Sequence, residues 1–207
     1  MSIVQSIDKI TAWVEQTVCS KVKMKVPAED KQATDGGYDY QLAAPAAFPL
    51  FVPTKDRLPP RIIAPFPSVC VRLVEGKDHL IAGKRVLKVQ FCFSVWDPGR
   101  HGPDVYLPDE NTRGQFVQIP GEDAQKWYRR DGDGWRDAWN FMDTAIRELE
   151  NAEYIDGLRL VKEQTIDFGP LAEQDAIPDY YPFWYAWIEF QIEEILQRSP
   201  KPYDDFL

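Results

Sequence analysis

The sequence predicts an α+β domain in which an antiparallel sheet of about four to five strands carries two main helices on one face. The first observation is a pair of segments with alternating apolar and polar residues, 68–75 and 86–96, joined by a glycine-containing connection. The second is that helical periodicity is confined to residues 2–20 and 135–150, so helices do not alternate with every strand. The third is the length of 207 residues, which is typical of a single domain over 1–207.

The N-terminal segment predicts a helix followed by a strand. Apolar residues recur every three or four positions between residues 2 and 20, and Ser2 or Ser6 can cap the first turn. Residues 21–26 then alternate lysine with apolar side chains, which indicates a short strand with one wet face. Because lysines discourage pairing with other chains, an edge position suits this strand.

Residues 27–67 are expected to form an extended arm rather than regular secondary structure. Eight of the 17 prolines lie in this segment, together with aromatic residues that need a surface to pack against. The arm is therefore expected to lie on its own domain or on a neighbouring subunit. Four of its aromatic residues are candidates for a subunit interface: Tyr38, Tyr40, Phe48 and Phe51.

The second half of the chain combines an irregular insertion with a helix and two strands. Residues 97–134 are rich in Asp, Gly and Pro and are expected to form a loop insertion. The helix over 135–150 places its apolar residues on one face, and strands are predicted over 157–166 and 183–192. Residues 198–207, which contain two prolines, are expected to form a mobile tail.

Charge is divided unevenly along the chain. Residues 1–96 hold 13 bases and 9 acids, a net charge of +4, whereas residues 97–207 hold 11 bases and 24 acids, a net charge of −13. This division predicts two electrically different surfaces, as a subunit needs when it stacks between different neighbours. The alternative is that loops simply collect acidic residues. The overall net charge of −9 disfavours a fold-wide nucleic-acid binder and a protein that binds anionic membrane surfaces.

The sequence contains no recognisable catalytic or metal-binding motif. We therefore predict no catalytic residue, no metal ligand and no cofactor, and we do not expect an enzyme. The two histidines, His79 and His101, lie in predicted loops without a nucleophile signature beside them. Residues 131–134, Asp-Gly-Asp-Gly, begin like a calcium loop, but the helix follows too soon, so a turn that caps the helix explains them.

The cysteines and the N-terminus bear on the compartment. Cys19, Cys70 and Cys92 are too few and too scattered for a disulfide framework, which indicates a reducing compartment. The N-terminus lacks the basic region and apolar run of a signal peptide, and no stretch approaches the roughly 18 apolar residues of a membrane span. We therefore expect the chain to be made and folded in a cytoplasm.

The loop insertion contains a cluster of aromatic and basic residues. Trp127, Tyr128, Arg129 and Arg130 follow one another, and these residue types are enriched at interface hot spots. Packing within the loop is one alternative, and stacking on nucleic acid is another. Because residues 97–133 carry a net charge of −3, the interface interpretation is favoured over nucleic acid. The four residues are therefore further candidates for a subunit interface.

The order and patterning of these elements resemble those of bacteriophage tail terminator proteins, including those of related contractile injection particles. The strand pair Ser68–Glu75 and Val86–Trp96 resembles the family's central pair, in which an aromatic-rich strand ends in a short turn, here at Asp97. Residues 134–139 resemble the start of the helix that crosses its sheet, and residues 181–190 resemble its closing strand. The resemblance covers three segments: residues 2–26, 68–96 and 134–195.

The resemblance implies a structural virion protein that forms a hexameric ring at the head-proximal end of a tail tube. Such a ring ends tube polymerisation and offers a docking surface to the head connector. The implied partners are further copies of the chain, the tail tube protein with or without a sheath, and the head–tail connector. DNA would pass through a lumen that does not bind it, and no membrane is involved. The implied location is the head-proximal tail end of a virion or tail particle, assembled in the cytoplasm of a bacterial host.

Two alternatives stay open at this point. The first is a head–tail connector, neck or tail completion protein, which belongs to the same class of particle components. The second is a small soluble enzyme or a binding module that uses the 97–134 loop. A deep pocket lined by paired carboxylates with shifted pKa values would favour the enzyme.

Overall fold

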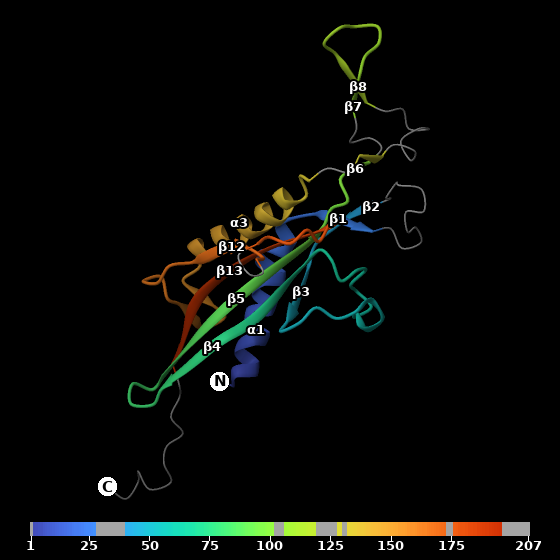
Figure 1. The fold of residues 1–207 in the computed structure, drawn as a ribbon. Helices are drawn as coiled ribbons and strands as arrows, with labels where there is room; N and C mark the ends of the chain where they lie inside the picture. The colour runs from blue at the N-terminus through green and yellow to red at the C-terminus, as the bar shows by residue number, and fades with distance from the viewer. Residues whose placement is uncertain are drawn as a thin grey trace, which may run out of the picture.

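The computed structural model describes residues 2–27, 40–101, 106–118, 128–129, 132–172 and 176–195 (Figure 1). Over these ranges the chain is a mixed α/β protein with two α-helices, α1 (Ile3–Thr17) and α3 (Trp135–Asn151). Most strand pairings are antiparallel, which is compatible with the predicted α+β class.

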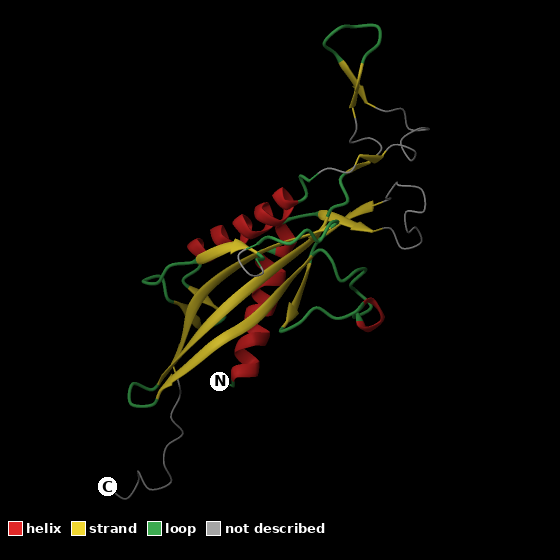
Figure 2. Ribbon diagram, in the orientation of Figure 1, coloured by secondary structure: helices red, strands yellow, loops and turns green. Residues whose placement is uncertain are grey.

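A seven-stranded sheet forms the centre of the molecule (Figure 2). Its strands lie in the order β10-β11-β13-β5-β4-β3, and β12 also pairs with β13. The pairing of β3 with β4 is parallel, whereas the other pairings in this sheet of the described chain are antiparallel. The strands are β3 (Ala46–Pro49), β4 (Ser68–His79), β5 (Lys84–Trp96), β10 (Tyr154–Ile155), β11 (Leu158–Leu160), β12 (Asp167–Pro170) and β13 (Phe183–Ile195).

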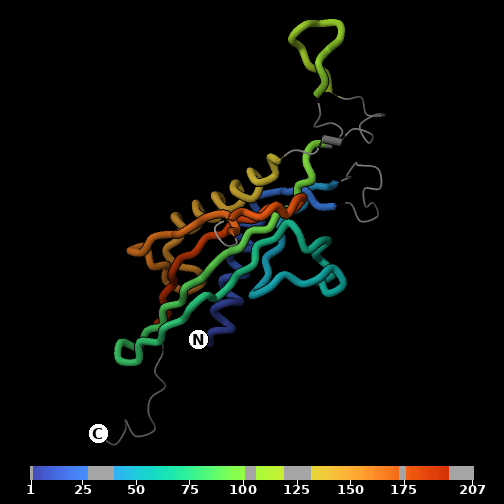
Figure 3. Tube along the Cα trace, in the orientation of Figure 1, coloured from blue at the N-terminus to red at the C-terminus, as the bar shows by residue number. Residues whose placement is uncertain are grey.

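The longest pair in the sheet joins β5 to β13, which run side by side in Figure 3. Every residue of the two strands is matched, from Phe183 opposite Trp96 to Ile195 opposite Lys84. On the other edge of β5, β4 forms a long hairpin with it. Alternating residues explain these strands, because the apolar set points to one face and the polar set to the other.

Smaller two-stranded sheets lie outside the central sheet in the described ranges: β1 (Met24–Pro27) with β2 (Tyr40–Ala43), β6 (Arg100–His101) with β9 (Tyr128–Arg129), and β7 (Tyr106–Pro108) with β8 (Phe116–Gln118). Two short 3₁₀ turns complete the elements, η1 (Cys19–Lys21) and η2 (Lys55–Arg57).

Both helices bury their apolar faces in one core with the inward-facing residues of the strands. Phe93 of β5 meets Phe141 of α3 edge to face with ring centroids 4.9 Å apart, and Phe91 meets Phe190 of β13 at the same distance. Ile10 of α1 belongs to the same cluster. Such ring pairs add to the free energy that is gained by burying the rings.

The first turn of α1 is closed by a capping box at Ser2. The Ser2 hydroxyl accepts a hydrogen bond from the Gln5 amide, and the Gln5 side-chain oxygen accepts one from the Ser2 amide. These bonds satisfy backbone donors that the start of a helix leaves open. Of the two predicted caps, Ser2 is therefore the one used, and Ser6 donates instead to Glu194 of β13.

The sheet face opposite this core is polar and half exposed where β5 and β13 carry Lys84, Lys88, Glu189 and Glu193. Lys84 and Lys88 of β5 form ion pairs with Glu193 and Glu189 of β13. Cross-strand pairs of opposite charge on neighbouring strands stabilise a sheet modestly. This part of the polar face of β5 and β13 is therefore held by ion pairs between the two strands.

The arm predicted over 27–67 is not wholly irregular, and this corrects the expected strand count. β3 lies inside it, parallel to β4, with Ala46, Ala47 and Phe48 buried. Prolines at positions 45 and 49 bracket this four-residue strand, so no alternating pattern of useful length can form. With β3 and the short strands of the second half, the sheet has seven strands rather than four to five.

The second half also contains strands that were not predicted. The strand predicted over 157–166 is present in part as β11, Leu158–Leu160, which forms a tight hairpin with the unpredicted β10 through Asp156 and Gly157 at φ of 45° and 85°. β12 went unrecognised because four residues that include Gly169 and Pro170 give no strand pattern. The 97–134 insertion carries β6 to β9, and the predicted 198–207 tail lies outside the described residues.

We predict that Gly134→Ala destabilises the protein. A Cβ at Gly134, just before α3, would overlap the indole of Trp184 in β13, so the helix start or the ring would have to move. The free energy of unfolding is expected to fall by about 2–3 kcal/mol, a cost typical of overpacking, in urea or thermal unfolding. Gly132→Ala is the matched control, because a Cβ there meets nothing within 4 Å. Equal effects of the two substitutions would contradict this account.

Candidate functional site

The structure separates the arm residues that the sequence predicted for an interface. Phe48 is only 4% exposed, so its ring packs within its own chain, whereas Phe51 is 67% exposed. Tyr40 is half-buried, and the Lys25 ammonium lies 5.2 Å from the centre of its ring. Tyr38 lies outside the described residues. Of the described arm aromatics, Phe51 therefore offers the largest free surface to a partner.

The second predicted cluster lies at the root of the loop insertion. Tyr128 and Arg129 form β9, in which Arg129 is opposite Arg100 of β6. Arg100 in turn lines a polar pocket, so the backbone of β9 runs beside a strand that contributes to this pocket. The other two members of the cluster lie outside the described residues: Trp127 and Arg130.

That polar pocket has a volume of about 710 Å³ and opens at the N-terminal end of α3. The strands β1 and β2, the segment after β5 and the first turn of α3 supply its walls. Its lining contains three bases and three carboxylates beside Tyr40, Leu42 and Gly99. The charged residues are Lys25, Arg100, Arg136, Asp97, Asp133 and Asp137.

Asp97, directly after β5, is the most heavily bonded of these groups. Its Oδ1 accepts hydrogen bonds from the Lys25 ammonium at 2.9 Å and from the Gly99 amide at 3.0 Å. The Lys25 ammonium also donates to the Gly99 carbonyl at 3.1 Å. The side chains of Lys25 and Asp97 are only 18% and 10% exposed, so each charge depends on the other for its stability.

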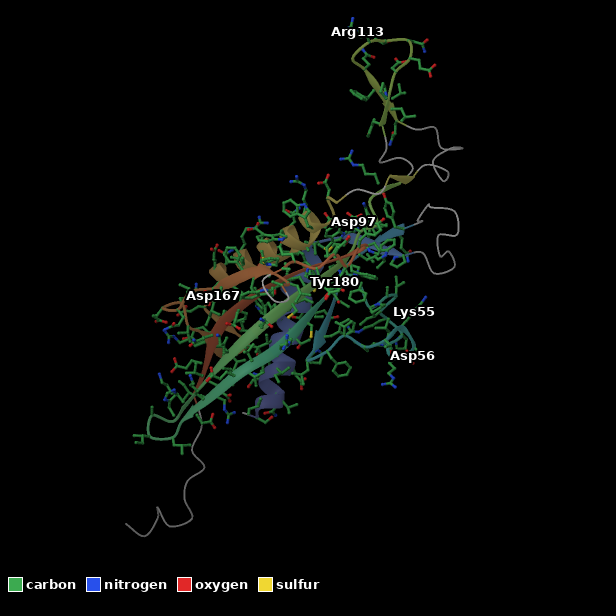
Figure 4. The ribbon with its side chains drawn as sticks, in the orientation of Figure 1. Lys55, Asp56, Asp97, Arg113, Asp167 and Tyr180 are labelled. Carbon is green, nitrogen blue, oxygen red and sulfur yellow. The ribbon has the colours of Figure 1, made fainter. Side chains whose placement is uncertain are left out.

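The backbone of Asp97 also ties the start of β13 to the end of β5. Its carbonyl accepts a hydrogen bond from Trp184 Nε1 at 3.0 Å, and its amide donates to the Pro182 carbonyl at 2.9 Å. Beside it, the Tyr181 hydroxyl donates to the Pro98 carbonyl at 2.6 Å. Figure 4 labels Asp97 and Tyr180 at this common end of the sheet.

Asp137 is the titratable group of the pocket with a shifted pKa. Burial raises the pKa of its carboxyl, the negative charge of Asp97 raises it further, and Lys25 opposes the change. A carboxyl that holds its proton to higher pH is the kind of group that can act as a general acid. The neighbouring Asp97, whose oxygen is already bonded by Lys25 and Gly99, is held in place rather than open to a ligand.

On the other side of the helix start lies an aromatic groove of about 380 Å³. Trp184 contributes one wall, while Arg136 stacks 4.8 Å from the Trp135 ring and separates the groove from the polar pocket. Its residues come from α3, β13 and the segment that joins β12 to β13. They are Trp135, Trp139, Pro170, Leu171, Ile177, Pro178, Tyr180, Phe183, Trp184 and Tyr185, and this set is here called the aromatic groove.

The cysteines do not form a nucleophilic site. Burial raises the pKa of the Cys19 thiol to about 12 and that of Cys70 to about 11, and it raises the pKa of Cys92 as well. Thiolate is the reactive form, so all three thiols are poor nucleophiles at neutral pH. Cys70 and Cys92 lie opposite each other on β4 and β5 and are both free.

The described histidine and carboxylate groups do not assemble a metal centre. Within the ranges that the structure describes, no three His, Cys, Asp or Glu side chains are grouped so that they could hold a metal ion. His79 is the last residue of β4 and does not line the polar pocket. His101 is the last residue of β6. No helix in these ranges is long and apolar enough to cross a membrane.

Comparison with protein-family models finds no match, and neither the curated proteins nor the solved structures contain a significant relative of this chain. The pocket and the groove are therefore interpreted from their own geometry.

Sequence reasoning missed both surfaces. The alternation over residues 21–26 predicts that Lys25 lies on a solvent-exposed face with the other lysines. In the structure its ammonium instead donates to Asp97, which is 72 residues away in the sequence. The groove residues between β12 and β13 lie in a segment that has no periodic pattern. The usable signals were the Trp96-Asp97 strand end and the concentration of aromatic residues around Tyr180 to Trp187.

We predict that Lys25→Met destabilises the protein because Asp97 would remain largely buried without its cation. The free energy of unfolding is expected to fall by about 2 kcal/mol or more, measured by urea unfolding at neutral pH. Lys23→Met is the matched control, since Lys23 lies on the same segment and is exposed. If Asp97→Asn restores much of the loss in the double variant, the ion pair is its cause. No rescue would point to lost packing instead.

We predict that Asp137 makes folding less favourable as the pH rises. Its pKa is higher in the folded than in the unfolded chain, so the folded chain binds more protons. Stability attributable to this group is therefore present below about pH 4, the unfolded pKa, and is lost as the pH rises through the folded pKa. The melting temperature of Asp137→Asn, relative to the original chain, should be higher at pH 7 than at pH 4.

The control for this prediction is Asp143→Asn, which removes an equal charge from an exposed position of the same helix. A pH dependence that is the same in both variants would contradict the assignment to Asp137.

Proposed function

We propose that this chain is a structural particle protein that forms a ring at the head-proximal end of a phage-like tail tube. In this role it ends tube polymerisation and offers a docking surface to the head connector. The proposal joins the resemblance to tail terminator proteins with one observation of the fold. Segments outside the central sheet expose apolar side chains that a partner would cover.

The β7–β8 hairpin is the clearest of these segments. Tyr106, Phe116 and Val117 are 56%, 65% and 48% exposed on a hairpin that pairs only with itself among the described strands. Figure 4 labels Arg113 at its tip, away from the central sheet. An isolated two-stranded hairpin is marginally stable in water, so burial against another chain would stabilise it.

The arm supplies a second such segment. Leu50 and Phe51, directly after β3, are 54% and 67% exposed. Exposed apolar residues on extended segments favour a protein that contacts several neighbours, because each segment can reach a different one. Catalysis, in contrast, needs converging reactive groups, and the Cys19 and Cys70 thiols are buried while Asp97 is paired with Lys25.

The proposed partners follow from this position. Further copies of the chain form a ring, which we expect to be a hexamer, with the tail tube protein and any sheath on one face and the connector on the other. DNA passes through the lumen, and part of the acidic second half faces it, because acidic residues repel phosphates. The protein is then located at the head-proximal tail end of the particle after assembly in the bacterial cytoplasm. A connector, neck or tail completion protein is the alternative within the same class.

A second candidate function rests on the polar pocket. The cavity of about 710 Å³ contains two neighbouring carboxyls, Asp97 and Asp137, and the pKa of Asp137 is raised. Such an arrangement is expected of a small acid–base enzyme or a binding module. We rank it second because Asp97 is engaged by Lys25 and the backbone.

The proposed function predicts the outcome of removing the protein from particle-producing cells. Without the ring the tube has no stop, so electron microscopy should show overlong tails or tubes. Tails of normal length without heads would instead support the connector alternative. Particles that are normal in length and attachment would overturn both structural functions.

Two substitutions separate assembly from pocket chemistry when they are introduced into that deletion background. Phe116→Asp charges the exposed β7–β8 hairpin and should fail to restore normal tails, because a partner would have to bury the new carboxylate. Asp137→Asn should restore them. The reverse pattern, with Phe116→Asp active and Asp137→Asn inactive, would favour the enzyme or binding module.

A further inference from the structure

An exposed apolar turn lies at one end of the central sheet. The β4–β5 hairpin runs past the neighbouring elements at that end (Figure 1), and its turn carries Leu80 and Ile81, which are 76% and 97% exposed. We call these two residues the hairpin tip. Burying two adjacent large aliphatic side chains at a protruding turn is favourable, because it removes their apolar surface from water. The tip therefore suits an interface.

The aromatic groove lies at the opposite end of the same sheet. Phe183 and Tyr185 line it, and Phe183 is opposite Trp96, whereas the tip follows the end at which Lys84 is opposite Ile195. The two ends are twelve residue steps apart, or roughly 40 Å along the strands. The tip of one protomer therefore cannot fill its own groove without dismantling the sheet.

The groove has room for the tip. Cavities of about 150 Å³ can hold a benzene-sized molecule, so a groove of about 380 Å³ can take two aliphatic side chains. Its lip offers further apolar surface, since Ile177 is 70% exposed and Leu171 is 39% exposed. Shape and polarity thus match between the two ends.

Charge also distinguishes the two ends. The tip segment, residues 77–85, holds three bases and one acid, whereas the described residues of the groove segment, 166–172 and 176–182, hold two acids and no base. All three bases also pair with carboxylates of their own chain, yet the side chains of Lys77 and Lys84 are 65% and 42% exposed and can face a partner. This is the charge division of the whole sequence on a local scale, and it favours tip against groove over tip against tip.

We infer that the hairpin tip of one copy of this chain inserts into the aromatic groove of the next copy. This contact joins different surfaces of the two copies, and contacts of that kind propagate until they close into a ring or continue as a filament. The inference rests on the proposed ring and names the surfaces that close it. Leu80 and Ile81 supply the buried anchor, and the difference in charge between the tip segment and the groove segment favours this orientation.

The test is the association of the full-length chain, measured by sedimentation velocity over a range of concentrations. Ile81→Asp in the tip and Ile177→Asp in the groove should each raise the dissociation constant by about a hundredfold or more, because each places a carboxylate in the apolar contact. Val4→Asp is the matched control, since Val4 is a 67% exposed apolar residue outside both surfaces. All three positions are exposed, so circular dichroism and melting temperature should stay unchanged.

Mixing the two variants gives the decisive result. The tip variant keeps an intact groove and the groove variant keeps an intact tip, so an equimolar mixture should form dimers and nothing larger. Variants that associate like the original chain would overturn the inference and leave the ring proposal standing. A loss of association in only one variant would also overturn it, and so would an original chain that stays monomeric at about 1 mM, a concentration at which a dissociation constant of about 1 mM would already be detected. The deletion experiment then decides the proposed function separately.

Discussion

The pairing of β5 with β13 is the constraint on which the rest of the structure depends. Both strands are matched along their whole length, although some 90 residues of sequence separate them. β4 completes one side of the pair, β11 and β12 complete the other, and the helices cover the apolar face that the pair creates. The hydrogen bond from Trp184 to the Asp97 carbonyl also follows from this pairing, because Asp97 is the residue after β5 and Trp184 is near the start of β13. Each of these features would lose its position if the register slipped by one residue, since a slip exchanges the two faces.

The start of α3 divides two environments with different chemistry. On one side, charged groups gather around Lys25 and Asp97, and on the other, aromatic rings form an open groove. Trp184 belongs to both, since its ring lines the groove while its Nε1 donates to the Asp97 carbonyl. The absence of a side chain at Gly134 lets that ring sit against the helix. A single close approach of helix and strand therefore keeps a polar surface and an apolar surface within one small region, which suits a protein that meets dissimilar neighbours.

Local pattern predicted the elements that are long and amphipathic and failed where pairing is set at a distance. The spacing of Val89, Phe91 and Phe93 identifies β5, and the same reasoning finds β4, β13 and both helices. β3 has four residues, of which Pro49 is the last, and its parallel partner cannot be inferred from its own composition. The ion pair of Lys25 with Asp97 and the groove around Ile177 arise only when distant segments meet. The sequence pattern treats Phe48 and Phe51 alike as interface candidates, because it does not show that β3 buries Phe48 and leaves Phe51 exposed.

The short outer strands of the central sheet limit how the chain can associate through its backbone. On one side, β3 has four residues that end in Pro49 and covers Ser68 to Val71 of β4, so residues 72–79 of β4 continue this edge; on the other side, β10 has two residues that lead straight into a tight turn. β3 and β10 are too short to template a growing β-fibril, and the edge part of β4 carries charged side chains, which disfavour edge-to-edge pairing. Edges that are short or charged disfavour aggregation through backbone pairing. Association of this chain with a partner would then be governed by side chains, whose contacts can be weak and reversible.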